Sequence, residues 1–178
     1  MVKLSLEELL EQADTVVVGT VAGQTSTWNN PHTAILTDST VVVEQVIKGS
    51  PVETVTVRTS GGMVGKVGLW VEDEPPLRIG EEAVLFLDTR QMPARVVGAF
   101  QGMYVVRDGT VTWEGRTVPL AEFLNTIQTA ILPIVQSKIQ NLRHTAWRTR
   151  RSSWRAKSKI RVAGLFTAYR LPPTAYSS

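Results

Sequence analysis

The stretch Thr15-Val16-Val17-Val18-Gly19-Thr20-Val21 (residues 15–21) is dominated by β-branched residues. Such side chains favour extended backbone and pack well on a pleated surface, so the stretch predicts a buried strand. Directly before it, apolar residues recur at helical spacing over residues 4–13, and Ser5 followed by Glu8 fits a capping box. The chain is therefore expected to pass from a short helix into a buried strand.

Further strands are expected along the first 113 residues, separated by turn residues. They are predicted at residues 34–47, 54–59, 83–87, 95–100, 103–107 and 110–113. The last two flank Asp108-Gly109, a pair that suits the positive φ angles of a type I′ turn. The polar residues 24–32 are predicted to form a loop, and the glycine-rich residues 60–68 a mobile connection. Trp70 follows this connection and is expected to pack rather than to line a groove.

A second helix is predicted over residues 120–131, where apolar residues recur at helical spacing after Pro119. Pro133 is expected to kink or end it. The elements together predict a mostly β fold (α+β by count), an OB-like barrel of five to six strands with a short N-terminal helix and a C-terminal helix. Closure is favoured because it removes exposed strand edges. The expected domains are residues 1–132 and a basic helical or disordered tail, residues 133–178.

Three segments carry a resemblance to known proteins: residues 13–21 (ADTVVVGTV), 43–49 (VEQVIKG) and 77–87 (LRIGEEAVLFL). In this order they resemble a group of small bacterial exported domains of unassigned function. They are also similar, more distantly, to the netrin-like barrel of tissue inhibitors of metalloproteinases. The resemblance implies an OB-like barrel and an extracytoplasmic setting. It does not imply protease inhibition, because those inhibitors use an amino-terminal Cys and disulfides, and this chain has no Cys.

Charge divides the chain into two parts of opposite character. Residues 1–130 hold nine Lys/Arg and sixteen Asp/Glu, whereas residues 131–178 hold ten Lys/Arg and no Asp/Glu. Arginine and lysine neutralise phosphates, and interleaved tryptophans stack on bases, so the tail predicts binding to single-stranded nucleic acid or an anionic membrane surface. The candidate residues are Arg143, Trp147, Arg148, Arg150, Arg151, Trp154, Arg155, Lys157, Lys159 and Arg161.

Three other interpretations of the tail compete with that one. The tail folds back on the acidic body, or it is a disordered solubilising end. Alternatively it is not an evolved extension, since an acid-free end rich in Arg, Ser and Trp is also what out-of-frame or truncated coding produces. The sequence does not choose among these interpretations.

Catalytic chemistry finds little support in the sequence. The only histidines, His32 and His144, have no nucleophile signature near them, and thiolate chemistry is excluded by the lack of Cys. The carboxylates of residues 72–74 lack the spacing of a calcium loop and are expected in a solvated loop. No catalytic residue, metal site or cofactor is predicted. The alternative, a hydrolase that uses carboxylates, would draw on Asp14, Asp38 and Asp88 at strand ends.

The sequence therefore predicts a non-enzymatic binding or interaction module for an unknown protein or polymeric ligand. No apolar run is long enough for a transmembrane segment. The resemblance places the protein outside the cytoplasm. A cytoplasmic location is the alternative, because Met1 leads straight into the amphipathic residues 4–13, and an extracytoplasmic chain would have lost its signal peptide before this residue.

Overall fold

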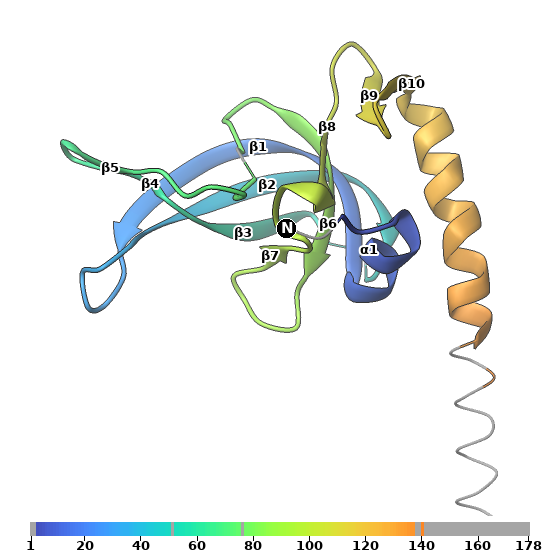
Figure 1. Cartoon of the computed structure of the whole chain (residues 1–178), viewed down its shortest axis with the longest axis horizontal. Coiled ribbons are helices and arrows are strands. Elements are labelled where there is room, and N and C mark those ends of the chain that lie inside the picture. The colour runs from blue at the N-terminus through green and yellow to red at the C-terminus, as the bar shows by residue number, and fades with distance from the viewer. Residues whose placement is uncertain (1–2, 51, 76, 138–139, 141–178) are drawn as a thin grey trace, which may run out of the picture. The chain divides into compact units, whose positions relative to one another are not determined.

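The computed structural model describes residues 3–50, 52–75, 77–137 and 140, and strands predominate in it. The elements are α1 (Leu6–Gln12), β1 (Thr15–Trp28), β2 (Ile35–Lys48), β3 (Thr54–Ser60), β4 (Gly62–Val64), β5 (Val67–Leu69), β6 (Glu82–Asp88), β7 (Arg95–Val96), the 3₁₀ helix η1 (Ala99–Gly102), β8 (Met103–Val105), β9 (Thr110–Trp113), β10 (Arg116–Pro119) and a C-terminal helix over residues 120–137. Figure 1 shows this order. The mostly β class and the two helices are confirmed.

The first compact unit spans Met1–Ile134, and a second begins at Val135. The predicted division between residues 132 and 133 stays a prediction, because residues 141–178 lie outside the described part of the chain.

The capping box predicted for α1 is present. The Ser5 hydroxyl accepts the N–H of Glu8, and the Glu8 carboxylate accepts the N–H of Ser5 at 2.8 Å. At the other end of the helix, the Lys48 ammonium donates to the carbonyl oxygens of Leu10 and Ala13. A cation at a helix C-terminus satisfies orphan carbonyls and interacts favourably with the helix dipole. Lys48 thus ties the end of β2 to α1.

The main sheet has the order β3-β2-β1-β6-β7, with β8 also paired to β6. The β-branched run of residues 15–21 forms the centre of this sheet, as predicted, and it is antiparallel to both β2 and β6. The predicted loop at residues 24–32 is wrong over residues 24–28, because β1 continues to Trp28 in register with β2. Gln24 and Ser26 hydrogen-bond to side chains of β2, whereas Thr25 and Thr27 face solvent. Pairing with β2 therefore holds these polar residues in a strand.

An OB-like barrel is not shown, because the strand ladders do not close. The remaining gap lies between β3 and β7. One isolated parallel bridge, Val57 to Ala94, lies across it, and Ala94 exchanges backbone hydrogen bonds of 2.8 Å with Thr56 and Arg58. β7 is only two residues long, so it covers little of the β3 edge.

The meander after β7 differs from its predicted pairing. Asp108 and Gly109 have φ of 50° and 69°, so the predicted turn is confirmed. The hairpin around it is reduced to a single bridge between Arg107 and Thr110. β9 pairs with β10 instead, across Glu114-Gly115, whose φ angles are also positive. The sequence prediction missed this second turn.

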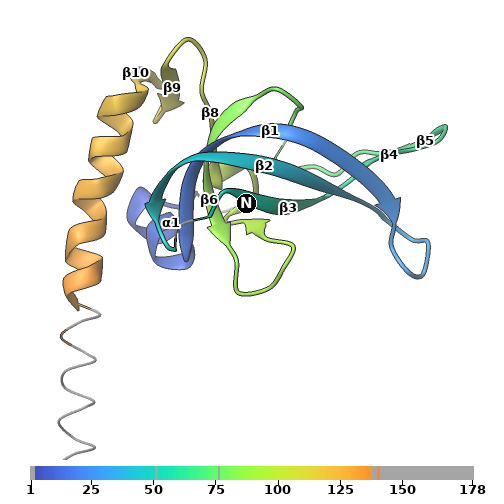
Figure 2. The same ribbon diagram turned by 180° about the vertical axis from the view of Figure 1, so that it is seen from behind.

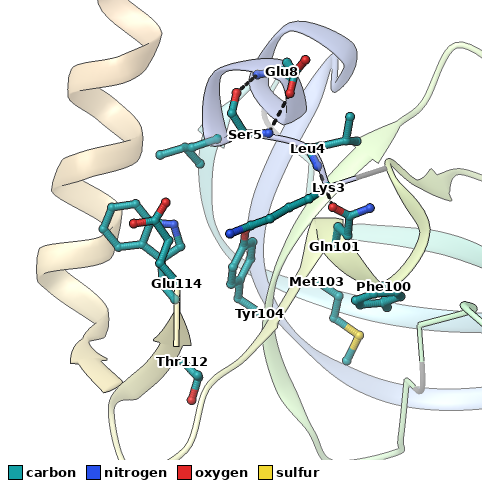
Figure 3. Close-up of a pocket in the computed structure, with 12 residues that line it drawn as sticks. Lys3, Leu4, Ser5, Glu8, Phe100, Gln101, Met103, Tyr104, Thr112 and Glu114 are labelled. Atoms are coloured by element: carbon teal, nitrogen blue, oxygen red, sulfur yellow. Dashed lines mark hydrogen bonds between the residues drawn. The ribbon is translucent and has the colours of Figure 1, made fainter. Parts of the chain in front are cut away.

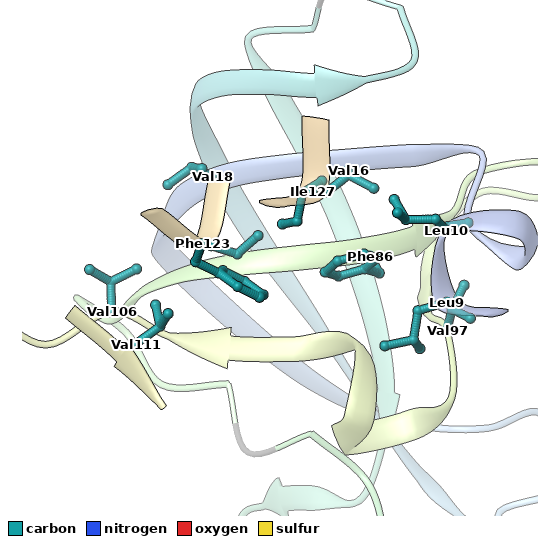
Figure 4. Packing of buried hydrophobic residues seen from close by; sticks show 12 residues of the cluster. Leu9, Leu10, Val16, Val18, Phe86, Val97, Val106, Val111, Phe123 and Ile127 are labelled. Carbon is teal, nitrogen blue, oxygen red and sulfur yellow. The ribbon is translucent and has the colours of Figure 1, made fainter. Parts of the chain in front are cut away.

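Two hydrophobic clusters lie on the two faces of β1 and β6. Alternate residues divide between them, so that Val16 and Phe86 belong to one cluster and Val17 and Leu85 to the other. All four are fully buried. Figure 4 shows the first cluster, in which Phe123 of the C-terminal helix lies beside Phe86 of β6. Burial of each such side chain contributes about 1.5–3 kcal/mol.

The C-terminal helix includes the predicted residues 120–131. Phe123 and Ile127 are fully buried, one helical turn apart, and Tyr104 packs on Phe123 with ring centroids 4.7 Å apart. Pro133, which was expected to kink or end the helix, does not end it, because helical backbone continues to residue 137. Figure 2 shows the helix and the β4–β5 hairpin near opposite ends of the sheet.

Candidate functional site

Polar side chains cover the inner face of the sheet beyond the apolar core, near the turn that joins β1 to β2. Five of them form what we call the polar floor: Gln24, Ser26, Thr37, Ser39 and Thr59. They come from three neighbouring strands, with Ser26 opposite Thr37 and Thr37 opposite Thr59. Four polar residues are buried in the described part of the chain, and Thr37, Ser39 and Thr59 are three of them.

Most of the polar floor is internally hydrogen-bonded. The Thr37 hydroxyl donates to the carbonyl of Gly61 at 2.7 Å and therefore accepts from the Ser26 hydroxyl at 2.8 Å. The Gln24 amide donates to Ser39 Oγ and to the Leu77 carbonyl, which leaves its Oε1 as an acceptor.

Thr59 is the exception in the polar floor. It is only 7% exposed, and its hydroxyl has no hydrogen-bond partner among the described residues. The Thr59 oxygen is not among the fully buried polar atoms that lack a partner, so solvent in the groove reaches it and a ligand there can hydrogen-bond to it.

A groove of about 530 Å³ lies over the polar floor, and we call it the hairpin groove. All of the floor except Ser39 lines it, together with residues 60–63, residues 68–71, Glu74, Pro75 and Leu77. One wall thus comes from the β4–β5 hairpin and the segment that follows it. The prediction that Trp70 packs rather than lines a groove is wrong, because its side chain lines this groove and is 85% exposed.

Glycines allow the hairpin to pass close over the floor. A Cβ on Gly62 would lie 2.2 Å from Thr37 Oγ1 and 2.6 Å from Ser26 Oγ, and its φ is 131°. Only glycine adopts this backbone conformation readily and fits this space. Gly65, with φ of 60°, provides the tight turn between β4 and β5. The predicted connection at residues 60–68 thus contains β4 and most of β5.

The electrostatic character of the hairpin groove is acidic. Glu74 is the only charged residue among the described residues that line it. Glu74 is half-buried and forms no ion pair with a described residue. Glu72 and Asp73 precede it and are exposed, as predicted for residues 72–74. Lys66, in the turn of the hairpin, does not line the groove. Anionic ligands such as phosphates therefore have no cationic partner among the described residues that line this groove.

The carboxylates considered for a hydrolase each have a local partner. Asp14 accepts the N–H and the hydroxyl of Thr89 at 2.8 and 2.9 Å. Asp38 accepts two guanidinium N–H groups of Arg58 at 2.6 and 2.7 Å, and this hydrogen bonding holds the Asp38 pKa below its ordinary value. The neighbouring Arg90 lowers the pKa of Asp88 in the same way. Asp14 and Asp88 therefore stabilise the residues at the ends of β1 and β6, whereas Asp38 lies within β2 and pairs with Arg58 directly opposite on β3.

A second pocket, of about 680 Å³, lies between residues 3–8, residues 100–104 and β9. Figure 3 shows that its polar groups mainly hold the N-terminal segment: Gln101 Oε1 accepts the N–H of Leu4, and the capping box of α1 lies at the rim. Burial raises the pKa of the Tyr104 hydroxyl, and the charge of Glu114 adds to this effect. Since Tyr104 also packs in the core, we assign this pocket a structural role.

The predicted tail site lies outside the described residues. This applies to Arg143, Trp147, Arg148, Arg150, Arg151, Trp154, Arg155, Lys157, Lys159 and Arg161, and to His144. His32 is exposed in the loop after β1, as predicted, and stacks on Trp28 with centroids 6.1 Å apart. Within the described ranges, no group of three or more His, Asp or Glu could hold a metal ion, and no helix is long and apolar enough to cross a membrane.

Sequence reasoning missed the polar floor, although a signal for it exists. Along β2 the inward positions read Ile35, Thr37, Ser39 and Val41, so the period-two pattern of the core continues with hydroxyls. A strand that alternates in this way carries its polar residues onto the buried face.

No protein-family model matches the chain, and a search of the curated proteins gives no match. The functional assignment therefore rests on the geometry of the hairpin and the hairpin groove.

Proposed function

We propose that the chain is a non-enzymatic binding module and that a partner protein docks on the β4–β5 hairpin. The observation that carries this proposal is the exposure of four large apolar side chains in one short segment: Met63 (69%), Val67 (51%), Leu69 (37%) and Trp70 (85%). So many large apolar side chains exposed within eight residues are uncommon on soluble monomers, and exposed apolar surface marks interaction sites. Tryptophan is also among the residues most enriched at interface hot spots.

The form of the hairpin supports docking. Val64 pairs with Val67, and Met63 pairs with Gly68, so apolar side chains occur on both faces of the ribbon. A two-stranded ribbon buries little of its own side-chain surface. Figures 1 and 2 show the tip of the hairpin extending beyond the main sheet, away from the other described elements, where a partner can reach it.

The finer fold and the location belong to the same proposal. The bridge from Val57 to Ala94 supports an OB-like, netrin-like barrel in which β3 and the segment before β7 are joined by a single bridge. The resembling segments, which fall largely in β1, β2 and β6, support an extracytoplasmic protein. Fractionation of the native host with mass spectrometry of the N-terminus tests the location. Recovery from the cytoplasm with Met1 intact would contradict it.

The basic tail supports a second proposal, binding to single-stranded nucleic acid or an anionic membrane surface. Its ten Lys/Arg without any Asp/Glu are the observation in favour. Fluorescence anisotropy with a single-stranded oligonucleotide at about 50 and 200 mM salt tests the nucleic-acid form, because phosphate contacts weaken steeply over this range. Binding that survives removal of residues 141–178 would exclude the tail as its source.

Photo-cross-linking in the native host tests the docking proposal. A benzophenone amino acid replaces Val67 in one variant and Val42 in a matched control. Both are valines on strands with similar exposure, 51% and 44%, but Val42 lies on the outer side of β2. We expect one discrete protein adduct from position 67, none from position 42, and loss of the adduct when Met63→Ser is added.

Two results would contradict the docking proposal. Equal adducts from positions 67 and 42 would indicate nonspecific contact. Absence of any adduct from position 67, with both variants folded as judged by thermal unfolding, would leave the exposed hairpin without a partner. An adduct of twice the chain mass would identify the partner as a second copy.

A further inference from the structure

Within the described part of the chain, the hairpin groove is lined by hydrogen-bond acceptors and one negative charge, and by no cationic side chain. Glu74 carries its charge, and Gln24 Oε1 and the Thr59 hydroxyl have no partner among the described residues. The indole of Trp70 lines the groove and is exposed to solvent. We propose that the hairpin groove binds a cationic side chain, arginine or lysine, of the partner polypeptide. This inference rests on the proposed function, because it specifies the chemistry of the docked protein.

Charge complementarity favours this occupant over an anion or a neutral chain. A guanidinium carries five N–H donors and no acceptor, which matches a lining whose free polar groups accept. It also stacks on an indole face and pairs with a carboxylate. Pro75 and Leu77 are buried at the base of the groove, where they offer apolar contact to the methylene stem.

Thr59 supplies an observation independent of the acidic residues. Its side chain lies on the inner face, lines the groove and is more than nine-tenths buried, yet its hydroxyl has no partner in the described chain. Solvent reaches this hydroxyl, and a ligand that enters the groove can take the place of that solvent. Because Ser26 and Thr37 already bond to each other and to Gly61, Thr59 is the floor hydroxyl left for the ligand.

Two peptides of equal shape test the charge requirement: acetyl-Gly-Arg-Gly-amide and its citrulline counterpart, which lacks the charge. Each is titrated into the full chain while NMR follows the indole N–H of Trp70, assigned with Trp70→Phe. We expect the arginine peptide to shift this resonance saturably and to bind about tenfold more tightly than the citrulline peptide.

Variants locate the binding in the groove. Glu74→Gln should abolish the preference for arginine, whereas Glu72→Gln should retain it, since Glu72 is an equally acidic neighbour that does not line the groove. Thr59→Val, which keeps the shape and removes the hydroxyl, should weaken the arginine peptide about threefold or more.

Three results would overturn the inference. Equal binding of the two peptides would show that charge is not recognised. A shift of Trp70 by a neutral sugar such as maltose, without one by arginine, would assign the groove to carbohydrate. If arginine gives no response while the adduct from position 67 persists, the inference about the groove is wrong and the docking proposal stands, because Val67 does not line the groove. A response to arginine without that adduct would instead contradict the proposal that a protein docks on the hairpin.

Discussion

The bidentate pair of Asp38 and Arg58 is the contact whose pH dependence the structure predicts most directly. Hydrogen bonds from Arg58 lower the pKa of Asp38 in the folded chain. A depressed folded-state pKa stabilises the protein above the unfolded-state pKa of about 3.9, and this stabilisation is lost as the pH falls through the folded-state value.

We expect Asp38→Asn to lower the free energy of unfolding at pH 7 by about 0.5–1 kcal/mol, because both side chains are about one third exposed and solvent screens the pair. The difference from wild type should shrink as the pH falls below the unfolded-state pKa and vanish once the pH is below the lowered folded-state pKa of Asp38. Urea unfolding across this pH range measures it. A difference that grows toward acid pH would contradict the assignment.

Gly62 decides whether the hairpin can lie over the polar floor. Gly62→Ala places a methyl group 2.2 Å from Thr37 Oγ1 on a backbone with φ of 131°, and we expect a loss of about 3 kcal/mol or more. Gly65→Ala is the matched control, since its φ is also positive but nothing lies within 4 Å, and it should cost only about 1 kcal/mol. Urea unfolding of both variants at pH 7 measures the contrast, and equal losses would contradict the close approach.

At the scale of elements, the hairpin should be less protected than the sheet from which it projects. β1 is paired on both sides at Val17, which is fully buried, whereas β4 and β5 pair only with each other. We expect amide hydrogens of residues 62–69 to exchange at least about 100-fold faster than those of residues 16–19. Native-state exchange followed by NMR checks this ratio. Equal protection would mean that residues outside the described part of the chain hold the hairpin in place.

The sequence predicts elements that local pattern controls, and it misses those that pairing controls. Three local patterns each predict their strand or helix without reference to the rest of the chain: the β-branched run of residues 15–21, the apolar run of residues 83–87 and the helical spacing of residues 120–131. The strand character of residues 24–28 depends on β2 opposite, and the exposure of Trp70 depends on where the hairpin projects. The residues next to them in the sequence indicate neither the strand at residues 24–28 nor the exposure of Trp70, so the groove could not be predicted.

At the scale of the whole molecule, both hydrophobic clusters lie within residues 1–134. We therefore expect a chain that ends at residue 137 to fold, with a thermal midpoint within about 3 °C of the full chain. Scanning calorimetry of the two chains compares them. A fall of more than about 10 °C would show that the core depends on residues beyond 137 and would contradict a self-sufficient first unit.

Docking on the hairpin is the central claim, and the affinity for the cross-linked partner tests it most directly. Met63 and Met92 are matched, since they are 69% and 63% exposed, but only Met63 lies on the hairpin. We expect Met63→Ala to weaken binding by about tenfold and Met92→Ala to leave the Kd unchanged within about twofold. Equal Kd values for the two variants, or a larger effect of Met92→Ala, would contradict the claim.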